Sequence, residues 1–143
     1  MTNFASQLAR IEQECKVKLP ESYRRLMSNY PPSLLAIHYF NDPKWGGPYS
    51  FVLLQDPGEV LALNLEMREL WPDSDYSELP LPDTYLFVGH DGCGNTFAID
   101  TAGPDTCPVL EFDHEDPCWI SRAGTLDEFV DQLIAEAKEK GWI

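Results

Sequence analysis

The sequence predicts an α+β domain in which helices flank an antiparallel sheet, and three observations lead to this prediction. Apolar residues recur at helical spacing in four separate segments. Short strand-like runs joined by tight turns follow one another between the third and fourth of these segments, an order typical of antiparallel pairing. The chain has 143 residues, the size of one domain, and no repeat or linker divides it. We therefore expect a single domain over residues 1–143.

Two amphipathic helices are expected at the start of the chain. The first has its apolar residues at helical spacing, namely Phe4, Leu8, Ile11 and Cys15. The second begins at Pro20, because a first helical residue does not need the N–H that proline lacks. Pro31 and Pro32 should end it. Its expected buried side chains are Tyr23, Leu26, Met27 and Tyr30.

Two strands and a third, central helix are expected next. Residues 34–40 and 49–55 are apolar runs typical of strands. Asp56, Pro57 and Glu59 then have the spacing of a helix cap, with proline at the first helical position and glutamate at the third. The helix should end at Pro72, and its expected buried stripe consists of Val60, Leu63, Met67, Leu70 and Trp71.

Three strands and a C-terminal helix are expected in the second half. The strands should lie at 85–89, 96–100 and 109–114, separated by turns rich in glycine, asparagine and aspartate. Thr125 and Glu128 have the spacing of a capping box. The helix should end at Gly141 and bury Leu126, Phe129, Val130, Leu133, Ile134 and Ala137.

The charge of the chain is strongly negative and unevenly placed. Ten Lys and Arg against 24 Asp and Glu give a net charge of −14. Residues 1–50 carry six basic and four acidic residues, a net +2, which leaves −16 for the remainder. Nucleic acid is not an expected partner, because phosphate binding requires a basic face, whereas a basic protein would be attracted. The same charge also fits a role in solubility alone.

Neither a membrane span nor an export signal is evident. No apolar run approaches the roughly 18 residues that a spanning helix needs, and the first residues lack a basic stretch followed by an apolar one. We expect a soluble, cytoplasmic protein. Its four cysteines, which include no C-x-x-C pair, are then expected as free thiols, although two disulfides remain an alternative: Cys15, Cys93, Cys107 and Cys118.

Histidine and carboxylate groups occur together at His90-Asp91 and at Asp113-His114-Glu115-Asp116. Such groups could bind a metal or act as an acid–base pair, and a small hydrolase built on His90, Asp91 and His114 is one hypothesis. The spacing argues against it, because neighbours on a strand point to opposite faces. The glycine-rich segment 89–94 lacks a following helix and a lysine, so it predicts a hairpin turn and not a phosphate site. We expect no catalytic residue, metal or cofactor.

The best candidate binding site is the loop at 72–84, with three prolines and four carboxylates. An ordered acidic loop of this kind could bind a basic partner, although a plain solvated loop fits the pattern too. Tryptophans beside loops could also anchor a partner. Core packing is a better interpretation for Trp71 and Trp119 than it is for Trp45. The candidate partner-binding residues are therefore Trp45, Asp73, Asp75, Tyr76, Glu78 and Asp83.

Several segments, in this order, resemble the SUKH superfamily, which includes Smi/Knr-type regulators of cell-wall assembly. Ile11-Glu12 followed by Leu19-Pro20-Glu21-Ser22-Tyr23 is similar to the family's opening helices. Residues 89–100, GHDGCGNTFAID, resemble its central hairpin. Residues 108–115 and 125–130 resemble its closing strand and final helix. The resemblance covers most of the chain.

The resemblance implies an antiparallel sheet flanked by helices and no catalytic activity. It implies that bacterial members are immunity proteins that bind and neutralise polymorphic toxins, many of them nucleases, and that fungal relatives are interaction hubs. This compact chain favours an immunity factor that occludes a basic toxin domain. The alternative is a regulatory scaffold, but hubs usually carry disordered extensions for extra partners.

Overall fold

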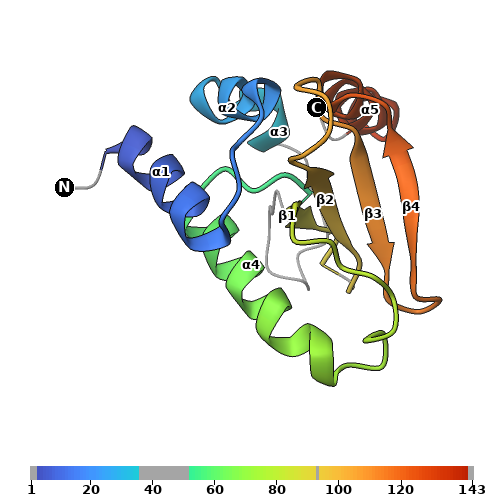
Figure 1. Cartoon of the computed structure of the whole chain (residues 1–143). Coiled ribbons are helices and arrows are strands. Elements are labelled where there is room, and N and C mark those ends of the chain that lie inside the picture. Colours follow the sequence, from blue (N-terminus) through green and yellow to red (C-terminus); the bar gives the residue numbers. More distant parts are fainter. Residues whose placement is uncertain (1–2, 36–51, 93, 142–143) are drawn as a thin grey trace.

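The computed structural model describes residues 3–35, 52–92 and 94–141 (Figure 1). The predicted α+β class is confirmed, with helices around an antiparallel sheet. Among the described helices, none is long and apolar enough to cross a membrane. The elements are α1 (Phe4–Cys15), α2 (Glu21–Ser28), α3 (Pro32–Leu35), α4 (Pro57–Leu70), the 3-10 helix η2 (Trp71–Asp73), β1 (Tyr85–His90), β2 (Thr96–Asp100), β3 (Val109–Asp113), β4 (Cys118–Ala123) and α5 (Leu126–Glu139).

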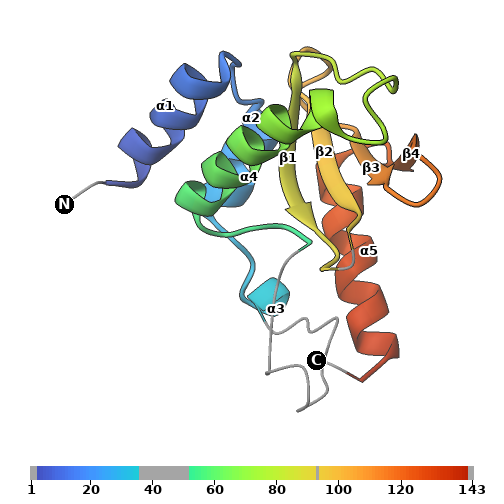
Figure 2. The same cartoon turned by 90° about the horizontal axis from the view of Figure 1, so that it is seen from below.

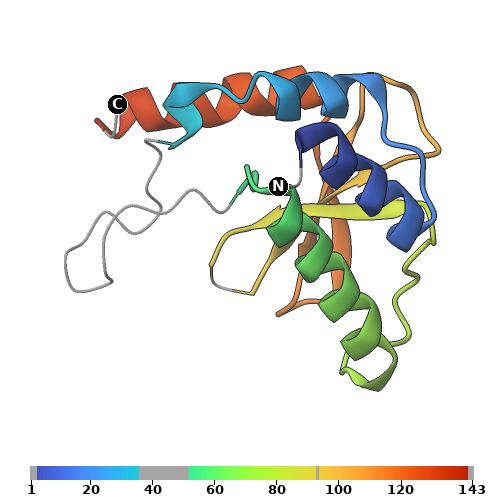
Figure 3. The same ribbon diagram turned by 90° about the vertical axis from the view of Figure 1, so that its left-hand side faces the viewer.

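The described sheet has the strand order β1-β2-β3-β4, and every neighbouring pair is antiparallel. Side chains alternate between its two faces, as the period of two in a strand requires. Leu86 and Ile99 point into a core shared with α1, α2, α4 and α5. Phe87 and Phe112 point the other way, into a second cluster that contains Trp71. Figure 3 shows α2 and α5 along one side of the strands.

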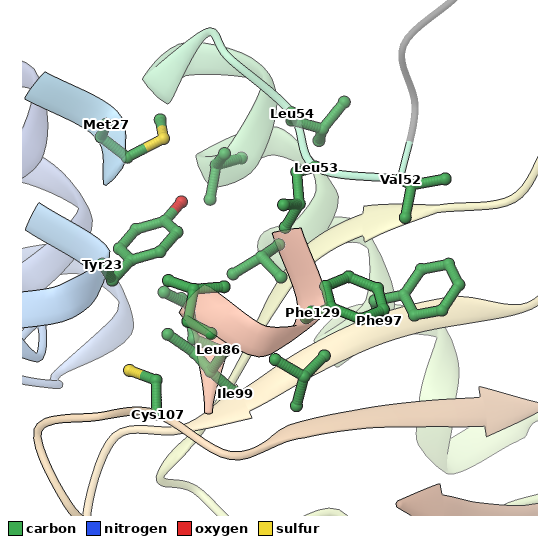
Figure 4. Close-up of a cluster of buried hydrophobic side chains, with 14 of the residues drawn as sticks. Tyr23, Met27, Val52, Leu53, Leu54, Leu86, Phe97, Ile99, Cys107 and Phe129 are labelled. Atoms are coloured by element: carbon green, nitrogen blue, oxygen red, sulfur yellow. The ribbon is translucent and has the colours of Figure 1, made fainter. Parts of the chain in front are cut away.

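Helix α5 covers the first face of the sheet. Its cap forms as predicted, because the Thr125 hydroxyl accepts a hydrogen bond from the Glu128 amide at 3.0 Å. Phe129 and Leu133 are buried, and the Phe129 ring centre lies 5.4 Å from that of Phe97 (Figure 4). A helix defined by its own cap and apolar stripe is the kind of element that sequence periodicity identifies best.

Helix α4 lies along the edge strand β1, at the opposite edge of the sheet from β4 (Figures 1 and 2). The buried side-chain amide of Asn64 takes the place of a neighbouring strand. Its Oδ1 accepts from the Phe87 amide, and its Nδ2 donates to the Phe87 carbonyl, both at 2.8 Å. Nδ2 also donates to the Val60 carbonyl at 2.8 Å within the helix. These bonds satisfy backbone groups that an edge strand otherwise leaves unpaired.

The two strands predicted before α4 are wrong where the structure describes them. Leu34 and Leu35 belong to α3, and residues 36–40 lie outside the described residues. Residues 52–55 form an irregular segment, and 49–51 lie outside the described residues. The Leu54 amide donates to the Val88 carbonyl at 2.9 Å, so this segment lies beside β1. Its apolar run is buried in the first core (Figure 4), and such a run alone does not distinguish a strand from other buried chain.

Strand β4 was missing from the sequence prediction. It pairs with β3 from Val109↔Ala123 to Asp113↔Cys118. Only Ala123 of its six residues is buried. A half-exposed edge strand has too few apolar residues to stand out in the sequence, and its pairing depends on β3.

The predicted faces of α2 and α4 also need correction. Tyr30 lies beyond the end of α2, and its hydroxyl donates to the Leu53 carbonyl. On α4 the expected stripe is correct in part: Val60 and Trp71 are buried and Leu63 and Met67 pack against the cores, whereas Leu70 is 53% exposed. Leu61 and Asn64, which lie outside the predicted stripe, are buried as well. Leucines occur all around this helix, so apolar spacing could not identify every buried position.

Replacing Phe129 or Leu133 with alanine should lower the free energy of unfolding by about 2–5 kcal/mol, because each change leaves a cavity in a buried helix face. Gln132→Ala, on the exposed side of the same helix, is the control and should change it by less than about 0.5 kcal/mol. Denaturant melts measure both effects. Small, equal effects at all three positions would contradict the packing of α5.

Replacing Asn64 with alanine should lower the free energy of unfolding by about 2–5 kcal/mol, because two buried backbone groups of Phe87 lose their partners. Asn64→Asp should also destabilise the fold, since a carboxylate can accept from the Phe87 amide but repels its carbonyl. Glu69→Ala, an exposed change on the same helix, is the control. An Asn64→Ala protein as stable as the wild type in urea melts would refute this role.

Candidate partner-binding surface

The loop at 72–84 covers the second face of the sheet. Tyr76, Leu79 and Leu81 pack against a cluster formed by Trp71, Phe87, Ala98 and Phe112. The Tyr76 ring centre lies 4.6 Å from that of Trp71 and 4.7 Å from that of Phe112. Tyr76, which the sequence predicts as a partner contact, is therefore held mainly by this aromatic cluster.

The backbone of the loop is held by three side chains from outside it. The indole N–H groups of Trp71 and Trp119 donate to the carbonyls of Leu79 and Pro80, at 3.1 and 2.9 Å. The Arg68 guanidinium donates to the Pro82 carbonyl at 2.8 Å. A loop fixed in this way loses little conformational freedom when it binds a partner.

Arg68 joins the loop to the edge strand. Its Nη2 donates to the Tyr85 carbonyl of β1 at 2.7 Å as well as to the loop. It follows Asn64 by one helical turn, so both residues face the same strand from α4. The sequence prediction missed this positioning role. One signal was present, since Arg68 is the only Lys or Arg among residues 51–100.

The loop exposes its carboxylates while its apolar side chains face the sheet. Asp73, Asp75, Glu78 and Asp83 are all exposed. Asp83 lies 3.9 Å from Arg68, but its side chain is fully exposed, and such a pair contributes little to stability. The structure thus brings together five of the six predicted binding residues on one segment. The sixth, Trp45, lies outside the described residues.

The histidine and carboxylate groups considered for catalysis are engaged in turns. The Gly92 amide donates to His90 Nδ1 at 3.2 Å, and the Asn95 amide donates to Asp91 Oδ1 at 3.1 Å. His114 Nδ1 lies 2.6 Å from the side-chain oxygen of Asn95. These contacts shape the β1–β2 turn and attach it to the end of β3.

Glu111 is a buried carboxylate on β3, and it too has a structural role. It accepts from Asn95 Nδ2 at 2.7 Å and pairs with Arg122 Nε at 2.9 Å. Burial of a carboxylate is tolerated only with such partners. The pair therefore ties β4 and the β1–β2 turn to β3.

The described residues offer no metal cluster and no activated thiol. Among residues 3–35, 52–92 and 94–141, no three His, Cys, Asp or Glu side chains are placed to hold a metal ion. Cys15, Cys107 and Cys118 are free, and Cys93 lies outside the described residues. Burial raises the pKa of Cys15, and it raises the pKa of Cys107 to about 12. At neutral pH these two thiols stay protonated and are poor nucleophiles.

The sequence matches the model of a known protein family. The sequence matches the model of the SMI1 / KNR4 family (SUKH-1) over residues 5–132. No curated protein matches it significantly. The matched range extends from α1 into α5 and includes strands β1–β4 and the acidic loop. The chain therefore belongs to the SMI1 / KNR4 family (SUKH-1), as the resemblance in its sequence predicted.

Proposed function

We propose that this protein is a non-enzymatic immunity factor that neutralises a basic toxin domain by binding over its active site. Membership of the family is consistent with a toxin-immunity role and with a Smi1/Knr4-type regulatory role. One observation supports the first role over the second. The acidic loop presents exposed carboxylates on a backbone held by Arg68, Trp71 and Trp119.

A rigid acidic surface suits the inhibition of an enzyme that acts on nucleic acid. Such an enzyme needs a basic active-site surface, because its substrate is a polyanion. A complementary acidic protein is attracted over long distances, which speeds association, and it competes for the same basic surface. The loop carries Asp73, Asp75 and Glu78 without a Lys or Arg among its own residues.

The absence of enzymatic activity is part of the proposal, and the local chemistry supports it. The thiols of Cys15 and Cys107 are protonated at neutral pH. His90 and His114 lie in turn contacts, and Glu111 is neutralised by Arg122. His90, His114 and Glu111 thus each have a structural contact in the described part of the chain.

Charge reversal of the loop should weaken protection from the toxin. The triple variant Asp73→Lys, Asp75→Lys, Glu78→Lys changes the local charge by about six units, and none of the three side chains makes a hydrogen bond or ion pair with another described residue. Asp83 is left unchanged because it lies beside Arg68. In cells that coexpress a candidate toxin domain from a gene next to this chain's gene, we expect survival to fall sharply with the triple variant. The melting temperature should stay within about 2 °C of the wild type.

The matched control reverses three exposed acidic residues outside α4 and the loop: Asp105, Asp131 and Glu139. It makes the same change in net charge and should protect nearly as well as the wild type. Association of the wild type with the toxin domain should slow strongly at about 0.5 M salt, whereas dissociation should change less. Equal protection by both triple variants would show that the loop is not the interface. A wild type that gives no protection would favour the regulatory role.

A further inference from the structure

Helix α4 has an exposed face that combines acidic and large apolar side chains. Leu65 is 45% exposed and Leu70 is 53% exposed, the two highest values among the exposed large apolar residues described. The acidic side chains of Glu66 and Glu69 lie on the same exposed side. We call this set the α4 ridge, which consists of Glu59, Ala62, Leu65, Glu66, Glu69 and Leu70. Leu65 and Leu70 lie at the two margins of this exposed side, because five residues along a helix correspond to a rotation of about 140°. The ridge therefore offers a partner two separate apolar contacts with carboxylates between them.

The α4 ridge is continuous with the acidic loop. The chain runs from α4 through η2 directly into the loop, and Figure 3 shows the green helix with the loop continuing from its lower end. Residues 51–100 contain ten acidic residues and one basic residue, Arg68. The guanidinium of Arg68 is directed to carbonyls of β1 and of the loop. Among the described residues, no ion pair includes Glu59, Glu66 or Glu69.

Two clefts flank the α4 ridge. One, of about 400 Å³, lies between α1 and α4, and its lining combines Leu65 and Cys15 with charged side chains such as Lys16 and Arg68. The other, of about 350 Å³, is lined by Ala62, Leu63 and His90 among others. Partial burial lowers the pKa of His90, so this imidazole is neutral at neutral pH. Each cleft has room for one or two large side chains from a partner.

We propose that the α4 ridge is the second half of the docking surface, and that it binds a basic segment of the partner that also carries aliphatic side chains. This inference rests on the proposed function. Lysine or arginine side chains of the partner would face Glu59, Glu66 and Glu69. Its aliphatic side chains would pack on Leu65 and Leu70.

Charge complementarity decides between this occupant and others. A symmetric dimer of the chain through this face would place acidic ridge against acidic ridge, and a nucleic acid would be repelled in the same way. A purely apolar partner would remove the carboxylates from water without pairing them, which is costly. Only a partner that carries both basic and aliphatic side chains can pair with the Glu66 carboxylate and also pack on Leu65.

The two kinds of side chain should act on different rate constants. Long-range attraction by Glu66 and Glu69 should speed association, and close packing of Leu65 and Leu70 should slow dissociation. The test uses an immobilised candidate toxin domain from a gene next to this chain's gene, inactivated at its own active site. Association and dissociation are measured with the full chain at low and at high salt.

The apolar half of the proposal is tested by the variant Leu65→Gln, Leu70→Gln. Its dissociation rate should rise about tenfold or more, with little change in association, as expected for anchors at the centre of an interface. Ile120→Thr, at a position 36% exposed on β4, is the matched control and should leave both rates unchanged. Single Leu65→Gln and Leu70→Gln variants, each with a measured melting temperature, exclude an effect through unfolding.

The acidic half is tested by the variant Glu66→Lys, Glu69→Lys. Association at low salt should slow about tenfold, and its dependence on salt should weaken. Asp131→Lys, Glu139→Lys makes the same charge change on α5 and should have a much smaller effect. If the wild type binds and both ridge variants bind like it, the inference is overturned while the proposed function stands. If the wild type itself does not bind, the proposed function fails and the inference fails with it.

Discussion

The placement of α4 against the edge strand β1 is the constraint on which the rest of this surface depends. Asn64 pairs with both backbone groups of Phe87, and Arg68 continues the same contact one turn later at the Tyr85 carbonyl. These bonds fix the rotation of α4 about its axis, because both side chains must face the strand. The side that carries Glu66 and Glu69 is then turned to solvent. The pairing of the Phe87 backbone groups by Asn64 thus determines which face of the leucine-rich helix α4 is exposed.

The same contacts give the acidic loop its shape. Arg68 reaches the loop as well as β1, and the second face of the sheet supplies an aromatic cluster on which the loop packs. The apolar side chains of the loop are thereby directed inward and its carboxylates outward. Repulsion between these carboxylates disfavours the compact loop, so the aromatic packing and the donated hydrogen bonds must outweigh it. A surface built in this way is charged and also preorganised, which is what fast and tight binding of a basic protein requires.

Much of this fold was predictable from the sequence, and the missing parts share a physical cause. Helix α5, strand β2 and the cap of α4 depend on residues close together in the chain, so local periodicity and caps identified them. Strand β4 depends on pairing with β3, and the order of the loop depends on Trp119, which lies 39 residues from Pro80. The sequence alone predicted that the candidate site is acidic. The exposure of Leu70 could not be predicted, because it depends on how α4 packs against β1 and not on spacing within the helix. Leu65 lies outside the buried stripe that the sequence predicts.

Hydroxyl-radical footprinting of the full chain, free and bound to the toxin domain, tests the central claim most directly. Leu65, Leu70 and Ile120 are exposed apolar side chains whose oxidation reports their contact with water. The two leucines belong to α4 and Ile120 to β4, and these elements lie at opposite edges of the sheet (Figure 1). The account predicts that binding protects Leu65 and Leu70 and leaves the oxidation of Ile120 unchanged. Protection of Ile120 with unchanged oxidation of both leucines would place the partner at the β4 edge and contradict the account.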